Sequence, residues 1–356
     1  MPKPLLPAIL SCKGLMLSDD EKYLFEKYNP VGINLFSRNI DNPQQLKSLV
    51  QEIKSCIGRT DVLIAIDQEG GRVRRLVEPH FRSYISAYNI GHLPIEKALR
   101  AAYLHTQLIS IDLAKLGINL NYAPVLDISY SNTTPALNSR CLSSDPHTIS
   151  TIGKIMVDTY IQNGILPCIK HIPGHGRAEC DPHLNLPTIK ASLKELEQDF
   201  LPFKNLNYCP IGMTAHIVLS SIDADLPITQ SAKGIQEIIR KHIDFKGILI
   251  SDAIDMHALH GSIEEKAINS LKAGCDLICY SSGLIADMQK IASSCPKASD
   301  NTLERFAQLQ KILDNKPQTA SENSLANEYN ELIGSVSPYQ EEYDSTEVLN
   351  LMMQKN

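Results

Sequence analysis

The 356-residue sequence lacks three features that would each assign it to a broad class. It has no long basic run and carries a net charge of −6, which argues against nucleic acid as its main partner. No stretch approaches the roughly 20 apolar residues of a membrane-spanning helix. The first segment, MPKPLLPAILSCKG, is too short and too interrupted by Pro4 and Pro7 for a secretory hydrophobic region, so we expect a strand there.

The cysteines form no recognisable framework. The chain has nine of them, an odd number, and no CxxC pair. Cys168 and Cys279 lie inside the apolar runs ILPCIKH and CDLICYS, which predicts buried, reduced thiols. Because 43% of the residues are hydrophobic, the chain can also bury a full core. Together these observations predict a soluble, cytoplasmic protein.

Short apolar runs alternate with amphipathic segments along most of the chain. Eight runs are strand candidates: Pro7–Ser11, Val31–Phe36, Val62–Asp67, Ile118–Ile128, Leu166–Lys170, Ile211–His216, Gly247–Asp252 and Asp276–Tyr280. Helices are predicted over Asn42–Cys56, Ile95–Leu116, Asp145–Asn163, Ser192–Leu206, Ser231–His242 and Ser262–Ala273. This alternation predicts an α/β fold, a (β/α)8 TIM barrel. A doubly wound open sheet is the alternative, but SCKGLMLSDDEK is not the glycine-rich phosphate turn that such a sheet would want after its first strand.

The chain changes character after about Lys316. We expect a single catalytic domain over residues 1–315 and a polar C-terminal tail over residues 316–356, which begins with sequences such as QTASENSLANEYN. A candidate last helix spans Ser345–Gln354.

Titratable residues follow five of the eight predicted strands directly. They are Asp67 and Glu69, Asp127, Lys170 and His171, His216, and Asp252. Because the chemistry of a (β/α)8 barrel sits at the carboxyl ends of its strands, we expect these side chains to share one rim.

Four sequence blocks in this order resemble family 3 glycoside hydrolases. They are IDQEGGRV at Ile66–Val73, KHIPGHG at Lys170–Gly176, DPH at Asp181–His183 and SDAIDM at Ser251–Met256. The resemblance runs from about residue 5 to about residue 300 and is closest to the single-domain bacterial β-N-acetylglucosaminidases, or β-hexosaminidases, of peptidoglycan recycling. It implies an exo-acting enzyme that releases N-acetylglucosamine (GlcNAc) from GlcNAc-1,6-anhydroMurNAc muropeptides, without a cofactor or metal. We expect it to work as a monomer.

The resemblance implies a retaining mechanism with Asp252 as the nucleophile. The residues themselves agree, because an Asp at the end of the apolar strand GILIS is fixed by the backbone, as an attacking group must be. Lys170 and Arg140 are candidate cations that keep it ionised. Asp252 could instead be a simple helix cap, and Asp255 is a nearby carboxylate that lies off the strand end.

The resemblance further implies that His183 is the general acid/base and that Asp181 orients it, in place of the usual second carboxylate. An Asp accepting from the imidazole fixes its tautomer and raises its pKa, so that it can hand a proton to the leaving oxygen. Pro182, where many relatives have Ser, restrains the backbone between the two residues. In such enzymes the loop is mobile, which Gly174 and Gly176 would permit.

Sugar binding falls, by the same resemblance, to Asp67, Arg75, Arg140, Lys170 and His171. Carboxylates and Arg or Lys donors suit the vicinal hydroxyls of a pyranose. His216 and Asp127 are predicted to hold the rim.

Other interpretations remain open. His171, His175, His183 and His216 could ligate zinc in a metal-dependent hydrolase, although a Pro-Gly step between the first two prevents them from sharing a helical face. A β-glucosidase-type enzyme and a non-catalytic sugar-binding protein are the remaining alternatives.

Overall fold

The computed structural model describes residues 3–182, 185–317 and 321–334. Within them, eight parallel strands form a closed barrel in the order β1-β10-β9-β7-β5-β4-β3-β2. The barrel strands are β1 Leu6–Ser11, β2 Pro30–Leu35, β3 Leu63–Ile66, β4 Leu120–Asn121, β5 Leu166–Ile172, β7 Ile211–Thr214, β9 Ile248–Ala253 and β10 Leu277–Cys279. A small parallel pair, β6 (Thr188–Ile189) and β8 (Val218–Leu219), lies outside the barrel. The predicted (β/α)8 barrel is therefore confirmed.

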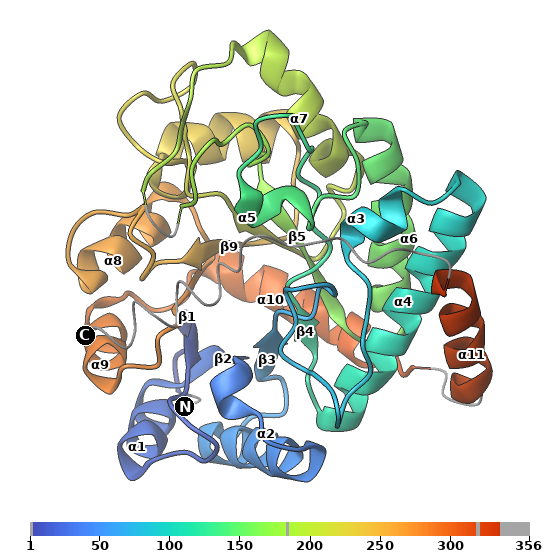
Figure 1. Cartoon of the computed structure of the whole chain (residues 1–356). Coiled ribbons are helices and arrows are strands. Elements are labelled where there is room, and N and C mark those ends of the chain that lie inside the picture. The colour runs from blue at the N-terminus through green and yellow to red at the C-terminus, as the bar shows by residue number, and fades with distance from the viewer. Residues whose placement is uncertain (1–2, 183–184, 318–320, 335–356) are drawn as a thin grey trace.

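Helices surround the barrel, as Figure 1 shows. The α-helices are α1 Asp19–Tyr28, α2 Pro43–Ile57, α3 Ala87–Gly91, α4 Ile95–Leu116, α5 Pro135–Asn138, α6 Pro146–Gln162, α7 Leu193–Asn205, α8 Ile263–Ala273, α9 Ile285–Ser294, α10 Asp300–Leu313 and α11 Glu322–Ile333. Two short 3₁₀ turns, η1 Ser37–Asn39 and η2 Ile228–Gln230, and a π-helix, η3 Gly234–His242, complete the helical elements of the described residues. Within the residues that the structure describes, no helix is long and apolar enough to cross a membrane.

The strand residues divide between one cluster inside the barrel and two clusters outside it. Ile248 and Ile250 of β9 belong to the inner cluster, whereas Leu249 between them packs outward against the helices. This alternation follows from the two-residue period of a strand, and it explains why a strand such as β9 begins with an unbroken apolar run. The pairing of Ile9 in β1 with Cys279 in β10 closes the barrel.

The fourth strand is shorter than its sequence predicts. The apolar run Ile118–Ile128 suggests one long strand, but β4 stops at Asn121 and the chain turns at Ala123, whose N–H donates to the Asn121 carbonyl. Pro124 has no N–H to donate to a neighbouring strand, so the ladder breaks there. Beyond it, Val125 forms a single bridge to Lys170.

The polar segment after Lys316 contains α11, which lies against α4 (Figure 1). Its Tyr329 is fully buried, and its Glu328 pairs with Arg100 on α4. The helix predicted at Ser345–Gln354 lies outside the described residues.

A buried ion cluster closes the amino-terminal end of the barrel. Asp276, just before β10, accepts hydrogen bonds from Arg240 (2.6 Å), Arg305 (2.6 Å) and the backbone N–H of Leu249 (2.9 Å). The Asp276 side chain is only 5% exposed. Because the chemistry of a (β/α)8 barrel lies at its opposite end, we assign this cluster to stability.

We expect Asp276→Asn to lower the free energy of unfolding by about 3 kcal/mol, because it leaves buried guanidinium groups without their counter-charge. Asp244→Asn is the matched control, since Asp244 pairs with Lys246 on the surface, where both side chains are more than half exposed. Urea denaturation of the two variants checks this, and equal stability would contradict the assignment.

Candidate active site

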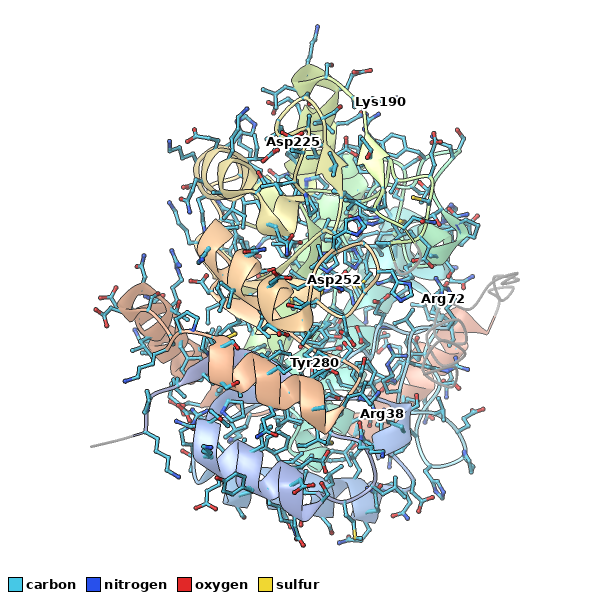
Figure 2. The ribbon with its side chains drawn as sticks, turned by 90° about the vertical axis from the view of Figure 1, so that its left-hand side faces the viewer. Arg38, Arg72, Lys190, Asp225, Asp252 and Tyr280 are labelled. Carbon is cyan, nitrogen blue, oxygen red and sulfur yellow. The ribbon has the colours of Figure 1, made fainter. Side chains whose placement is uncertain are left out.

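An open pocket of about 780 Å³ lies at the carboxyl ends of the barrel strands. Its walls come from several different strands: Asn34 lies in β2, Asp67 follows β3, Lys170 and His171 lie in β5, and Asp252 lies in β9. The strand ends thus bring together residues that are more than two hundred positions apart in the sequence. Figure 2 labels Asp252 together with Arg72 and Arg38, which come from the segments after β3 and β2.

Asp67 is held between two cations. Its Oδ1 accepts from Lys170 Nζ (2.9 Å) and its Oδ2 accepts from an Nη atom of Arg75 (3.2 Å). Burial alone would raise the pKa of Asp67, but the charges of Lys170 and Arg75 outweigh it and hold the pKa well below its ordinary value. Asp67 is therefore an ionised hydrogen-bond acceptor at the pocket wall.

A second carboxylate, Glu69, completes this charge network. Its Oε1 lies 2.6 Å from Lys170 Nζ, and both of its oxygens accept from the guanidinium of Arg140 (2.8 and 2.9 Å). Burial opposes ionisation, but Arg140 and Lys170 lower the pKa of Glu69 to about 2. The sequence showed Glu69 at the rim but gave no sign that it clamps the two cations. Lys170 and Arg140, the candidate cations for Asp252, both pair directly with carboxylates after β3 and line the same pocket as Asp252.

His171 is oriented by a buried carboxylate. Asp127, fully buried, accepts from His171 Nδ1 (2.6 Å) and from the backbone N–H of His175 (2.7 Å). A carboxylate at this distance only accepts, so His171 donates from Nδ1 and its Nε2 is left for the pocket, which His171 lines. Burial raises the pKa of Asp127, and the nearby His171 more than offsets this.

Asp252 stands at the carboxyl end of β9 and lines two adjoining pockets. Its Oδ1 accepts from the backbone N–H of Ala253 (2.7 Å). Asp255, by contrast, accepts from the backbone N–H groups of Ser281 (3.2 Å) and Ser282 (2.9 Å), so its carboxylate is occupied in fixing the loop after β10.

The second, smaller pocket of about 300 Å³ joins Asp252 to the loop after β5. Asp181 and Pro182 line it, and Asp181 is only 6% exposed. His175 lines it too, and neither of its ring nitrogens has a hydrogen-bond partner among the described residues. Thus the structure brings Asp181 to the same pocket as Asp252. His183 lies outside the described residues.

The two glycines of this loop serve close packing. A Cβ on Gly176 would lie 1.9 Å from the Ile128 carbonyl oxygen, and one on Gly174 would lie 2.9 Å from the Asp199 Cβ. Thr133 also donates to the Gly176 carbonyl (2.6 Å). Close packing therefore accounts for glycine at both positions, and the mobility expected of this loop stays a prediction.

His216 holds the end of the strand that carries Asp252. Its Nε2 lies 3.0 Å from the Ala253 carbonyl and its Nδ1 lies 2.7 Å from the Thr229 hydroxyl. His216 therefore has partners at both ring nitrogens, and His171 Nδ1 is bonded to Asp127. Two of the four histidines considered for zinc thus have other partners. Among the residues that the structure describes, no group of three or more His, Cys, Asp or Glu could hold a metal ion.

Sequence reasoning missed two further pocket residues, Asn34 and Phe36. The guanidinium groups of Arg38 and Arg75 lie 4.5 Å and 5.5 Å from the centroid of the Phe36 ring. Asn34 and Phe36 both belong to the apolar run VGINLF, and only the closure of the barrel shows that they face the pocket.

The glycosyl hydrolase family 3 N-terminal domain matches residues 9–312 of the sequence. The chain belongs to glycosyl hydrolase family 3. Curated β-hexosaminidases of Bordetella avium and Neisseria gonorrhoeae are 31% and 32% identical to this family 3 chain, over 83% and 80% of its length and 86% and 80% of theirs. The solved structure of native NagZ from Neisseria gonorrhoeae superimposes with a TM-score of 0.83 at 28% identity, covering 94% of this chain and 99% of that one.

The buried histidine of this family 3 hydrolase predicts a pH dependence. Burial lowers the pKa of His175 from 6.5 to about 4, so the folded protein resists binding a proton that the unfolded chain accepts. Above pH 6.5 the free energy of unfolding is unaffected by protonation of this histidine. It decreases as the pH falls toward 4, and at pH 5 it is lower by roughly 2 kcal/mol. We expect His175→Asn to flatten this part of the profile, whereas His80→Asn, at an exposed position, leaves it unchanged. Urea denaturation between pH 5 and 7 measures both, and a profile unaltered by His175→Asn would contradict the interpretation.

Proposed function

We propose that this family 3 glycoside hydrolase is a retaining, exo-acting β-N-acetylglucosaminidase. The coarser activity, that of a β-hexosaminidase, is the one for which its curated relatives are named. The finer proposal is that it releases terminal GlcNAc from peptidoglycan-derived fragments of the GlcNAc-1,6-anhydroMurNAc type. This choice of substrate rests on the resemblance of the four sequence blocks. We further propose that the enzyme is a cytoplasmic monomer and needs no cofactor.

The observation that carries the proposal is the position of Asp252. It lies where the charged pocket and the smaller pocket of Asp181 meet, at the end of a strand that the barrel fixes on both sides. A nucleophile placed in this way reaches the sugar from a rigid support, and the group that protonates the leaving oxygen comes from the adjoining loop.

In the first step we assign Asp252 to attack the anomeric carbon, which forms a carbon–oxygen bond to the enzyme. The bond to the aglycone breaks, and His183, oriented by Asp181, gives its proton to the departing oxygen. In the second step neutral His183 takes a proton from water, the water oxygen attacks the anomeric carbon, and Asp252 leaves as a carboxylate. The configuration at that carbon is retained after two inversions.

The network of Asp67, Glu69, Lys170, Arg75 and Arg140 is suited to holding the sugar during both steps. Asp67 accepts hydrogen bonds from hydroxyls, while Lys170 and the arginines supply donors. All five groups stay charged at neutral pH, and their mutual pairing fixes them before the sugar arrives. Such preorganisation avoids an ordering cost when the substrate binds.

A chromogenic β-N-acetylglucosaminide and its β-glucoside analogue test the substrate class. We expect the first to be hydrolysed faster, and Asp252→Asn to lower kcat by at least about 10³-fold because no covalent intermediate can form. Asp255→Asn is the matched comparison, and we expect a smaller loss because Asp255 is bonded to the loop after β10.

Three results would change the assignment. Preference for the glucoside favours a β-glucosidase, loss of activity with a chelator favours a metal-dependent hydrolase, and no hydrolysis of either compound favours a sugar-binding protein. Mass-spectrometric mapping of the adduct left by a fluorinated glycoside locates the nucleophile independently, and we expect it on Asp252. Release of GlcNAc from a purified GlcNAc-1,6-anhydroMurNAc peptide tests the finer substrate.

His183→Ala tests the acid/base role by the leaving group of the substrate. We expect kcat/KM to fall most for aglycones of high pKa, because a good leaving group departs with little protonation. A loss of the same size across a series of aryl glycosides would count against His183 as the proton donor.

A further inference from the structure

Helix α11 lies beyond residues 9–312, the part of the chain that the family domain matches. Its outer face is tied to its neighbours by surface ion pairs, such as Glu328 with Arg100 and Glu322 with Lys115. Exposed pairs of this kind contribute little to stability. Tyr329 is different, because its side chain is fully buried and its hydroxyl reaches the barrel side of α4.

The Tyr329 hydroxyl begins a chain of buried hydrogen bonds. It accepts from the backbone N–H of Ile85 (3.2 Å) and lies 3.1 Å from His105 Nδ1. The other ring nitrogen, His105 Nε2, lies 3.0 Å from the carbonyl oxygen of Glu69. A carbonyl only accepts, so Nε2 carries the proton, and Nδ1 accepts from the tyrosine hydroxyl. Burial lowers the pKa of His105 to about 4, which agrees with this neutral tautomer.

This chain of hydrogen bonds ends at Glu69, the residue that pairs with the cations assigned to sugar binding. Glu69 pairs with Lys170 and Arg140 through its side chain while His105 holds its carbonyl oxygen. The next residue, Gly70, has a φ of +99°, and a Cβ there would lie 2.3 Å from the Ile85 carbonyl oxygen and 2.8 Å from His105 Cε1. The backbone at Gly70 is therefore packed closely against Ile85 and His105, the two residues to which Tyr329 is hydrogen-bonded.

We propose that Tyr329 and His105 are positioning residues that set the sugar-binding carboxylates from behind, which makes the C-terminal helix α11 part of the active-site support. The inference rests on the proposed function, because it assigns Glu69, Lys170 and Arg140 to the sugar. Without the Tyr329 hydroxyl, His105 Nδ1 and the Ile85 N–H lose their partner, and the imidazole is free to turn away from the Glu69 carbonyl. The carboxylate pair then loses its fixed place relative to Asp252.

The test separates sugar binding from catalysis in Tyr329→Phe, which keeps the buried ring. We expect KM for the chromogenic N-acetylglucosaminide, and Ki for free GlcNAc as a competitive inhibitor, to rise together by about 3- to 10-fold, with kcat within about twofold. Tyr103→Phe is the matched control, since it removes a tyrosine hydroxyl from α4 outside this hydrogen-bond chain, and we expect it to leave both constants unchanged. Glu328→Gln, which breaks a surface pair of the same helix, should likewise have no effect.

His105 gives a second test with a conservative substitution. His105→Leu removes both hydrogen bonds, and we expect it to raise KM and Ki at least as much as Tyr329→Phe. His105→Gln keeps an amide donor and an acceptor, and we expect it to recover part of the loss.

Unchanged KM and Ki in Tyr329→Phe, whether or not its melting temperature falls, would overturn the proposal and leave α11 a structural element alone. So would a fall in kcat that follows the folded fraction while KM stays constant. Failure of the proposed function would look different, because the unsubstituted enzyme itself would then release no aryl group from the substrate.

Discussion

The ammonium group of Lys170 is the interaction on which the active site depends. It is 2% exposed and lies within 3 Å of two carboxylates, Asp67 and Glu69, which would otherwise repel one another. Burying three charges is costly, and it becomes tolerable only when each is paired and hydrogen-bonded. The pairing raises the pKa of Lys170 against the opposing effect of burial, and the two carboxylates stay ionised in return. The loop after β3 and the end of β5 are therefore joined by charge as well as by the barrel.

Similar pairing fixes other residues around the pocket. Arg140 is held by Glu69, His171 by Asp127, and the end of β9 by His216. Each of these three thus has a second, buried group that fixes its orientation before any ligand arrives. In a site of this kind the binding energy of the sugar need not be spent on ordering side chains.

The sequence predicted the barrel because eight apolar runs alternate with amphipathic segments, and a titratable residue follows five of these runs, as Asp252 follows its strand. It also named Asp67, Lys170 and Asp252 as rim residues, and all three line one pocket. The catalytic roles given to Asp252, Asp181 and His183 remain proposals. The sequence failed where a single residue decides against the local pattern, as Pro124 does by ending β4 early. It also missed contacts between distant segments, such as Glu69 with Arg140 and Tyr329 with His105. Neither the type of a residue nor its spacing indicates a partner that is brought close only when the barrel closes.

The filled interior of the barrel has a consequence for how a glycan reaches the enzyme. Tyr122, Met213 and Cys279 line the bottom of the pocket and are almost fully buried, and beneath them lies the apolar cluster inside the strands. A ligand therefore cannot pass through the cylinder, and it enters and leaves by the open rim at the carboxyl ends of the strands. Because entry and release share this one opening, a product that stays bound there blocks the next substrate.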